Sequence, residues 1–284
     1  MMSSLTSAVS GLDNFQEQMD VIGNNIANVD TTGFKAGVVD FADAFSNTLQ
    51  APTAGSSSTS AGSNPIQIGT GVTITGINNN WNQGSLSTTG IPSDLAVSGN
   101  GFFMVQDPTT STQYATQAGD FNLNANGYLV TDTGEEVMGY SNSGLSTIGP
   151  IQINASQMPA TSNPNATMSS YSIGATGQIT VNLSDGTSFV CGQVLLQNFQ
   201  NPGALVNQGN NLYSNTAEAG PLAAMGAPGS SGLGTIQSGA LELSNVDLST
   251  EMANLITAQR AFEANSKIVT TSDEILQDVV SMKH

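Results

Sequence analysis

The sequence predicts an α+β protein in which coiled-coil-like helices at the N- and C-termini flank a central all-β domain, with extended linkers between them. Three observations support this prediction. Apolar residues near each end of the chain recur at alternating spacings of three and four, which places them on one stripe of a helix. Between the ends the apolar period changes to two, and Gly and Pro interrupt it at short intervals, as in all-β domains.

The N-terminal pattern predicts a helix over residues 3–29, within an N-terminal axial segment assigned to residues 1–33. Gly11 and Gly23 each weaken a helix by about 1 kcal/mol relative to Ala, so packing must hold it together. Residues 28–33, which are rich in Asn, Asp and Thr and end in Gly, supply a stop signal. The stripe consists of Leu5, Ala8, Leu12, Phe15, Met19, Ile22, Ile26 and Val29.

Residues 34–84 are assigned to a linker or extended arm. The first part, residues 34–50, mixes Phe, Ala and Asp and is expected to form a short irregular or helical return. Residues 51–64 consist mainly of Ser, Thr, Gly, Ala and Pro, a composition typical of a flexible linker. The alternative is an extended arm that is ordered only by neighbouring subunits.

The central β domain is expected over residues 85–215. Asn126-Gly127 stands between two alternating segments, which predicts a hairpin with a type I′ turn. The period-two pattern begins before this domain, at Ile66, Ile68, Val72 and Ile74. Within the domain, residues 95–98 lead into the apolar segment 99–105, and the further strand candidates are residues 121–130, 137–140, 148–153, 178–183, 187–198 and 211–214.

A second linker, residues 216–240, is rich in Gly, Ala, Ser and Pro, and residues 241–284 are assigned to a C-terminal axial helix. Ser244 or Asn245 is the expected N-cap, with Asp247 near the positive end of the helix dipole. The main stripe consists of Leu248, Met252, Leu255, Phe262, Val269, Leu276 and Val280. It is widened by Ile256, Ile268, Ile275, Val279 and Met282, which indicates contact with more than one neighbour.

The charge distribution excludes several classes of partner. Only 9% of the residues are charged, against roughly 25% in ordinary soluble domains. No Lys or Arg lies between residues 36 and 259, where thirteen Asp and Glu residues occur, and the whole chain carries a net charge of −17. Nucleic acid and anionic membrane surfaces are therefore not expected as partners, because both require basic residues. No apolar run is long enough for membrane insertion, and no cleaved signal peptide is recognisable at the N-terminus.

The sequence offers no catalytic, metal or cofactor site. Cys191 is the only cysteine and is expected as a small buried strand residue, and the only histidine is His284. Gly99-Asn100-Gly101 lacks the third glycine of a dinucleotide-binding loop and continues as a strand. The adjacent Glu135 and Glu136 are most simply a solvated turn, so we expect no enzyme activity and no cofactor.

Neither terminal helix has an adjacent partner in the sequence. Each must bury its stripe against the other helix or against another copy of the chain. A monomer with both helices in one core is the alternative, but the rest of the chain has little apolar surface to cover their outer faces. The pattern therefore indicates a homopolymer.

Three groups of motifs resemble those of the bacterial flagellar rod and hook (axial) protein family. They are residues 8–12, 19–28 and 32–35 near the N-terminus, Ser98-Gly99-Asn100-Gly101-Phe102-Phe103 at the start of the β domain, and residues 239–248 with 258–267 near the C-terminus. The motifs extend nearly from end to end, and their joint occurrence is specific. Within the family, residues 41–45 and 241–248 look most like the hook protein. The total length and the insertion at 51–68 look more like the distal rod protein.

The resemblance implies a structural subunit without catalytic activity that polymerises into the tubular hook and transmits torque, with the distal rod as the alternative. It further implies export through the flagellar type III apparatus without a cleaved signal peptide, and contact with other axial proteins of the rod, the hook–filament junction and the hook cap. On this basis the assembly interface is expected on two sets of residues. The N-terminal set is Leu5, Leu12, Phe15, Met19, Ile22, Asn24, Asn25, Ile26 and Asn28, and the C-terminal set is Leu248, Met252, Leu255, Phe262, Val269, Leu276 and Val280.

Overall fold

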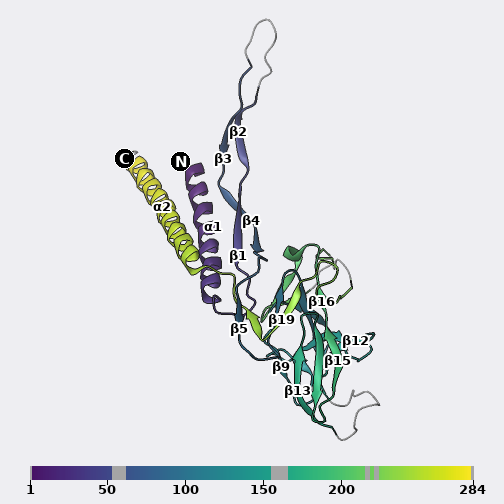
Figure 1. Ribbon diagram of the computed structural model, residues 1–284. Coiled ribbons are helices and arrows are strands. Elements are labelled where there is room, and N and C mark those ends of the chain that lie inside the picture. Colours follow the sequence, from purple (N-terminus) through teal and green to yellow (C-terminus); the bar gives the residue numbers. More distant parts are fainter. Residues whose placement is uncertain (1, 53–61, 155–165, 215–217, 221–223, 283–284) are drawn as a thin grey trace. The chain divides into compact units, whose positions relative to one another are not determined.

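A computed structural model describes residues 2–52, 62–154, 166–214, 218–220 and 224–282 of the chain (Figure 1). The chain forms two compact units. Unit 1 comprises Met1–Ala27, Gly37–Asn80 and Val246–His284, and unit 2 comprises Asn28–Ala36 and Trp81–Asn245. The combination of terminal helices with a central β-rich region confirms the predicted α+β class. Part of the Ala51–Asn64 segment, residues 53–61, lies outside the described residues.

Two long helices belong to unit 1. Helix α1 spans Met2–Ala27, close to the predicted 3–29, and ends just before the predicted stop signal. Helix α2 spans Leu248–Ser281 and is capped by Asp247, whose Oδ1 accepts hydrogen bonds from the backbone N–H of Ser249 (2.9 Å) and Thr250 (3.4 Å). The prediction that Ser244 or Asn245 caps this helix is therefore wrong. Asn245 uses its side chain within unit 2 instead, as described below.

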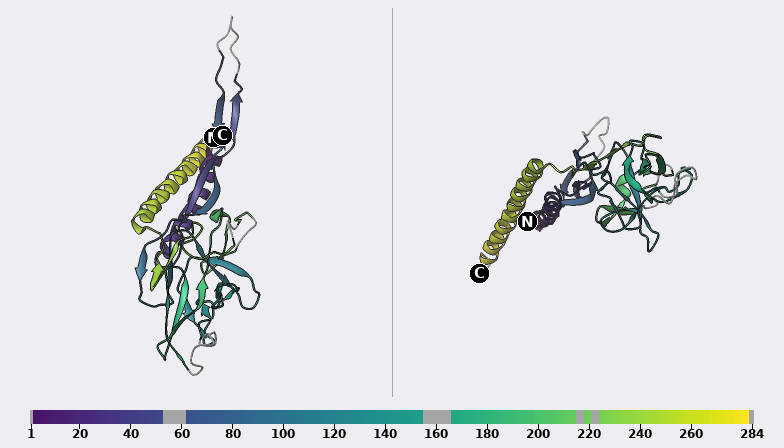
Figure 2. Two further views of the ribbon diagram at one scale, coloured as in Figure 1. Left: turned by 45° about the vertical axis from the view of Figure 1, so that its right-hand side comes forward. Right: turned by 60° about the horizontal axis from the view of Figure 1, so that its bottom comes forward.

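Small residues form the contact between α1 and α2, which pack together within unit 1 (Figures 1 and 2). Ala8 and Gly11 of α1 are buried, as are Ala258 and Ser272 of α2. A Cβ atom on Gly11 would lie 2.7 Å from Nδ2 of Asn265 on α2, which is too close for any real contact. Gly11 thus weakens the helix locally but allows α2 to approach.

A two-stranded ribbon completes unit 1. Strand β1 (Gly37–Asp43) pairs antiparallel with β4 (Val72–Asn79), and β2 (Ser46–Gln50) pairs with β3 (Ile66–Gly69). Residues 37–50 are therefore strands rather than the expected irregular or helical return. Gly37, Val39 and Ala42 of β1 are partly buried and the residues between them are exposed, with an irregularity between Asp40 and Phe41. The ring of the exposed Phe41 lies 6.0 Å from that of Phe15, centroid to centroid. Every residue of β2 and β3 is exposed.

Unit 2 is built on one large antiparallel sheet of the order β13-β14-β15-β11-β7-β8-β18-β17 (Figure 1). Short strands extend it, and two separate pairs, β19–β6 and β20–β5, lie beside it. The bounds are β5 Leu86–Thr88, β6 Leu95–Ser98, β7 Phe102–Gln106, β8 Gln113–Thr116, β9 Asn122–Leu123, β10 Leu129–Val130, β11 Glu136–Tyr140, β12 Ile148–Pro150, β13 Met168–Ile173, β14 Gln178–Leu183, β15 Ser188–Val194, β16 Leu196–Gln197, β17 Val206–Gly209, β18 Leu212–Ser214, β19 Thr235–Ser238 and β20 Ala240–Glu242; a 3-10 turn covers Pro202–Ala204.

Strand β7 is buried on both faces and divides the core of unit 2 in two. Phe103 and Val105 point into a large aliphatic cluster with strands β11, β14 and β15. Phe102 and Met104 point into a smaller cluster that contains Tyr213 and is covered by Trp81. The continuous apolar run of this strand reflects its central position, because a strand covered on both sides needs no polar face.

The predicted hairpin at Asn126-Gly127 exists between β9 and β10, but its turn is not type I′. A type I′ turn needs positive φ at both central residues, and here Gly127 has φ 82° while Asn126 does not adopt positive φ. Asn124 sets the geometry, because its Oδ1 accepts hydrogen bonds from the backbone N–H of Asn126 and of Tyr128, both at 2.9 Å. This Asx-type turn competes with the two-residue turn that the dipeptide alone suggests.

Candidate assembly interface

The N-terminal set of predicted interface residues is only partly exposed. Asn24 is exposed, whereas Leu5, Leu12, Phe15, Met19 and Ile26 are half-buried within unit 1. Ile22 and Asn25 are fully buried there. Asn28 lies beyond the end of α1, in the segment that belongs to unit 2. Much of the predicted stripe therefore packs inside unit 1.

Asn25 has a structural role within unit 1. Its Nδ2 donates to the carbonyl oxygen of Gly37 (2.8 Å), and its Oδ1 accepts from the N–H of Gly37 (2.9 Å). The side chain thus imitates a paired peptide group and fixes the first residue of β1 to the last turns of α1. At the other end of the β1–β4 pair, Asn14 Nδ2 donates to the carbonyl oxygen of Val72 (2.9 Å). The sequence identified Asn25 by motif but gave no sign of this partner.

The C-terminal set divides into two groups. Leu255, Phe262 and Val269 are half-buried within unit 1, in register with the buried Ala258. Leu248, Met252, Leu276 and Val280 are exposed. The contact of α2 with α1 therefore covers only the middle of the predicted stripe.

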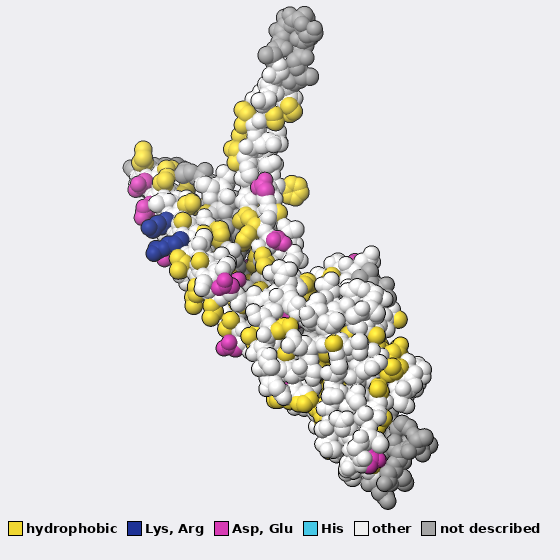
Figure 3. Space-filling model, in the orientation of Figure 1, with side chains coloured by type: hydrophobic (Ala, Val, Ile, Leu, Met, Phe, Trp, Pro, Cys, Tyr) yellow, Lys and Arg dark blue, Asp and Glu magenta, His cyan; other side chains and the backbone are white. Residues whose placement is uncertain are grey.

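A second apolar stripe of α2 is also exposed. It consists of Ile268, Ile275 and Val279, whose spacings of seven and four place them on one side of the helix. Exposed apolar residues also follow the ribbon, and Figure 3 shows hydrophobic side chains at the surface of both elements. Those of the ribbon are Val38, Phe41, Phe45, Leu49, Ile66, Ile68 and Ile77. Contiguous apolar surface of this kind marks interaction sites in soluble proteins.

The exposed positive charge of the described residues is confined to α2 (Figure 3). Arg260 forms a surface ion pair with Glu263 (2.9 Å), and Lys267 lies two turns further on. Helix α1 carries Asp13, Glu17 and Asp20 and no basic residue. Acidic and basic surfaces are therefore both available to neighbouring copies, although an exposed pair contributes only about 0–1 kcal/mol.

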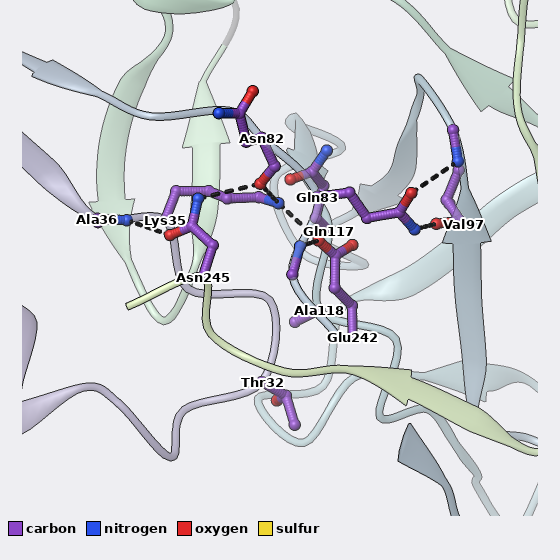
Figure 4. Close-up of polar contacts among 12 residues, drawn as sticks. Thr32, Lys35, Ala36, Asn82, Gln83, Val97, Gln117, Ala118, Glu242 and Asn245 are labelled. Carbon is purple, nitrogen blue, oxygen red and sulfur yellow. Dashed lines mark hydrogen bonds and ion pairs between the residues drawn. The ribbon is translucent and has the colours of Figure 1, made fainter. Parts of the chain in front are cut away.

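A buried polar cluster, here called the clasp, joins three distant segments of unit 2 (Figure 4). Lys35 Nζ lies 2.7 Å from Glu242 Oε1 and also donates to the carbonyl oxygen of Asn82 (3.1 Å). Asn245 Oδ1 accepts from the N–H of Ala36 (2.8 Å), and its Nδ2 donates to Asn82 O (3.0 Å). The segments 33–36, 82–85 and 242–245 are those next to the points where the chain passes between the units.

Backbone hydrogen bonds support the clasp. The N–H of Gly33 donates to the carbonyl oxygen of Glu242 (2.8 Å), and the N–H of Leu243 donates to that of Ser85 (2.9 Å). Glu242 Oε1 also accepts from the N–H of Gly84 (2.8 Å). Strand β20, which contains Glu242, falls at the start of the segment that the sequence analysis assigned to the C-terminal helix. The N- and C-terminal motifs thus meet in this cluster.

Chemistry for catalysis or metal binding is not apparent in the part of the chain that the structure describes. Its His, Cys, Asp and Glu residues form no cluster that could hold a metal ion. Cys191 is buried in β15, as predicted, and burial raises the pKa of its thiol to about 11. Neither α1 nor α2, the helices of these residues, is long and apolar enough to cross a membrane.

Comparison with known proteins explains this arrangement. Three family profiles match: "Flagella basal body rod protein" over residues 5–35, "Flagellar hook protein FlgE/F/G D1 domain" over 96–181 and "Flagellar basal body rod FlgEFG protein C-terminal" over 237–282. The chain is 40% identical over 283 residues to "Flagellar basal-body rod protein FlgG" of Bacillus subtilis, with 100% of both chains covered. The chain belongs to the flagellar rod and hook protein family.

Further relatives differ in how well they match. FlgG of Caulobacter vibrioides is 37% identical over 281 residues, with 97% of both chains covered. The "Flagellar hook protein FlgE" of Borreliella burgdorferi is 26% identical over 446 aligned positions, with 100% of both chains covered. Because this chain has 284 residues, the alignment to that hook protein contains long insertions.

Membership in the rod and hook family confirms the resemblance drawn from the motifs. The chain is a structural subunit of the bacterial flagellum, located in its basal-body and hook region, and it is not an enzyme. Rod and hook subunits assemble into axial polymers with other flagellar components. The exposed apolar faces of α2 and the ribbon agree with such an assembly. The interface residues expected from the sequence remain a prediction.

Proposed function

We propose that this chain is the subunit of the distal rod of the flagellar basal body. The sequence motifs favoured the hook, but the relatives support the alternative, the distal rod, better. Relatives that are 34–40% identical over nearly their whole length carry the name of the rod protein FlgG. The hook protein matched at 26% identity and only with long insertions.

The ribbon supports a rod rather than a hook. Strands β2 and β3 have no buried residue, and a two-stranded hairpin alone is marginally stable in water. Its apolar residues, such as Phe45 and Leu49, therefore need cover from neighbouring subunits. When the ribbon binds neighbouring subunits, it adds contacts that resist sliding between them. A rod that transmits torque without bending needs such contacts, whereas a hook must allow its subunits to slide.

Assembly in this proposal depends on the exposed faces of α2 and the ribbon. Burial of apolar surface stabilises by about 25 cal/mol per Å², but each residue ordered in the process costs roughly 1–2 kcal/mol of backbone entropy. An isolated helix cannot offset that cost, so several neighbours must contribute. The expected mechanism is therefore a helical tube in which terminal helices of many copies pack together.

The remaining partners follow from the same proposal. The subunit would pass through the flagellar type III export apparatus and contact other axial proteins, including those of the proximal rod and the hook. Contacts with proteins of the hook–filament junction and the hook cap are expected only if the chain is the hook subunit. The presence of a single, buried cysteine suits a protein that must be threaded in an extended form, because no disulfide can form within the chain.

Electron microscopy of basal bodies tests the proposal. A short peptide tag inserted after Gly186, in the exposed turn between β14 and β15, leaves both units intact, because nothing packs within 4 Å of that site. Gold-labelled antibody against the tag should mark the rod segment of isolated basal bodies. Motility of the bacterial strain that carries the tagged subunit is the control, because it shows that the tagged subunit still assembles. Label confined to the curved hook would contradict the proposal and restore the hook reading.

A further inference from the structure

A small polar cavity lies beside the clasp in unit 2. It has a volume of about 120 Å³ and is lined by Lys35 and Glu242 together with Trp81, Gln117 and Asn100. Lys35, Gln117 and Glu242 are buried and form its floor, whereas Asn100 is exposed at its rim. Figure 4 shows Gln117 next to the hydrogen-bonded clasp. The cavity is thus a formed pocket whose lining includes both buried and exposed residues.

Two of the residues that line this pocket each carry a buried polar atom without a partner. Among the described residues, the buried side-chain atoms without a hydrogen-bond partner are Trp81 Nε1, a donor, and Gln117 Oε1, an acceptor. Gln117 is only 8% exposed, and its Nε2 donates to the carbonyl oxygen of Gly101 (3.3 Å). That bond fixes the orientation of the amide, because a carbonyl oxygen in the place of Nε2 would face another acceptor. An unpaired buried donor and acceptor in one pocket are unfavourable, and native proteins rarely keep them.

The charges of the pocket restrict what could bind. Lys35 and Glu242 form a close ion pair, so neither an anion nor a cation meets uncompensated charge. The rim residue Gln83 is already paired: its Nε2 donates to Val97 O (2.6 Å) and its Oε1 accepts from Gly99 N–H (3.1 Å). The pocket is therefore complementary to an uncharged group that accepts one hydrogen bond from Trp81 Nε1 and donates one to Gln117 Oε1.

We propose that this pocket binds an amide group, a carboxamide side chain or a peptide bond, from a second copy of this chain in the assembled polymer. An amide carries one carbonyl acceptor and an N–H donor on one small plane, which matches the two unpaired atoms. The inference rests on self-association of the subunit and not on the choice between rod and hook. A water molecule can form the same two hydrogen bonds. Water is present in both soluble and assembled protein, whereas the amide of a neighbouring copy is present only in the polymer, so comparing the two states distinguishes them.

Trp81 provides the readout, because it is the only tryptophan of the chain. Its rings contact Phe102 and Tyr213 edge-on, with centroids 5.2 and 5.0 Å apart, so its position in the pocket is fixed. The experiment measures acrylamide quenching of Trp81 fluorescence in soluble protein and in sedimented polymer from the same preparation. When an amide of a neighbour covers the pocket, quenching falls on assembly.

A substitution separates pocket binding from general burial of this surface. Gln117→Met removes the unpaired acceptor at similar volume, together with the long 3.3 Å hydrogen bond to Gly101 O, so it should lower the stability of the soluble chain by at most about 1 kcal/mol. The same change leaves the neighbour's N–H without a partner, which should raise the concentration needed for assembly about tenfold, the equivalent of ~1.4 kcal/mol. Gln193→Met is the matched control, because Gln193 is also buried but donates to Thr176 O (2.7 Å) away from the pocket. It should destabilise the soluble chain and leave the change in Trp81 quenching on assembly intact.

The outcomes are distinguishable. Lower quenching on assembly, together with an assembly defect confined to Gln117→Met, supports the inference. Wild-type polymer with the same Trp81 quenching as soluble protein overturns it, since water alone then serves the pocket, and leaves the rod proposal untouched. A Gln117→Met variant that assembles like wild type overturns it as well. Wild-type protein that never sediments contradicts both this inference and the proposed function.

Discussion

Lys35 and Glu242 are 207 residues apart in the sequence, yet Lys35 Nζ lies 2.7 Å from Glu242 Oε1 inside unit 2. Their side chains are only 1% and 3% exposed. The pair joins the segment that follows α1 to the segment that precedes α2. This buried ion pair therefore joins the ends of unit 2 from which both helices continue, together with the hydrogen bonds from Ala36 N–H to Asn245 and from Gly33 N–H to Glu242 O.

Loss of one partner of this pair should destabilise unit 2 strongly. Lys35→Met leaves the Glu242 carboxylate buried without a counter-charge, which costs about 3–5 kcal/mol. Adding Glu242→Gln removes that charge and keeps an acceptor for the N–H of Gly84, so the double variant should be more stable than Lys35→Met alone. Urea denaturation of the soluble chain measures both. Additive losses in the double variant would show that the two charges do not interact.

Asn25→Ala should loosen α1 from the ribbon. It removes both hydrogen bonds to Gly37, and at roughly 1 kcal/mol each the loss is about 2 kcal/mol. Thermal unfolding followed by far-ultraviolet circular dichroism, to which helices contribute most, should show an earlier transition. Gln16→Ala, at an exposed position of the same helix, is the control and should change stability by less than about 0.5 kcal/mol. Equal losses of stability in Asn25→Ala and Gln16→Ala would contradict the conclusion that the hydrogen bonds of Asn25 hold β1 to α1.

Ile275→Asp should block assembly while leaving the soluble chain folded. Ile275 is exposed on the second stripe of α2, and full burial of such a side chain stabilises by about 1.5–3 kcal/mol. The concentration needed for sedimentation should therefore rise at least about tenfold. Thr270→Asp adds the same charge to an exposed position of α2 on another side and should have a much smaller effect. By contrast, Ile22→Asp is a poor test, because Ile22 is buried within unit 1 and its loss would disturb folding.

The stability of unit 2 should depend on Asp120 in an unusual direction. Burial, together with the nearby charges of Asp132 and Asp94, raises the pKa of this carboxyl above its ordinary value. The folded state then holds the proton more tightly than the unfolded chain, so the charged form opposes folding above the raised pKa. Asp120→Asn should stabilise unit 2 at neutral pH, and its advantage should vanish as the pH falls below the ordinary value for Asp.

Asp107 provides a comparison of opposite sign for this pH dependence. Its pKa is lowered because Oδ1 accepts from the N–H of Thr109 (2.7 Å) and Oδ2 from the hydroxyl of Thr110 (2.8 Å). Asp107→Asn should therefore weaken the fold at neutral pH, and the difference from wild type should disappear in acid. Denaturant titrations between neutral and acidic pH measure both variants. An Asp120→Asn variant that is less stable than wild type at neutral pH would contradict this account.

The sequence predicted the helices better than the arm or the clasp. The alternating spacing along residues 5–26 and 248–280 depends only on local geometry, so both helices followed from it. Period-two spacing from Ile66 to Ile74 indicated one side of the ribbon, but residues 37–50 were not expected as strands, because their partners lie beyond the Ser-rich segment. Asn245 and Asp247 are both good N-caps by type, and only the tertiary hydrogen bonds of Asn245 to Ala36 and Asn82 decide between them.

The assembly interface stays a prediction, but the structure shows that part of the predicted set packs inside unit 1. Periodicity identified Leu255, Phe262 and Val269 as apolar contact residues. It did not show that they are partly buried within unit 1, because the spacing of apolar residues does not tell contacts within the chain from contacts between copies. The clasp was missed entirely. Lys35 and Glu242 lie in the two terminal motifs, but nothing local indicates that residues so far apart form a buried pair.

Hydrogen exchange measured on soluble protein and on sedimented polymer tests the central claim most directly. The claim is that other copies of the chain cover the exposed apolar faces of α2 and the ribbon. It predicts that amides of α2 between Ile268 and Val280 become protected about tenfold or more on assembly, the equivalent of ~1.4 kcal/mol, while β7 in the core of unit 2 is unchanged. Amides of α2 that exchange at the same rate in both samples would contradict the claim.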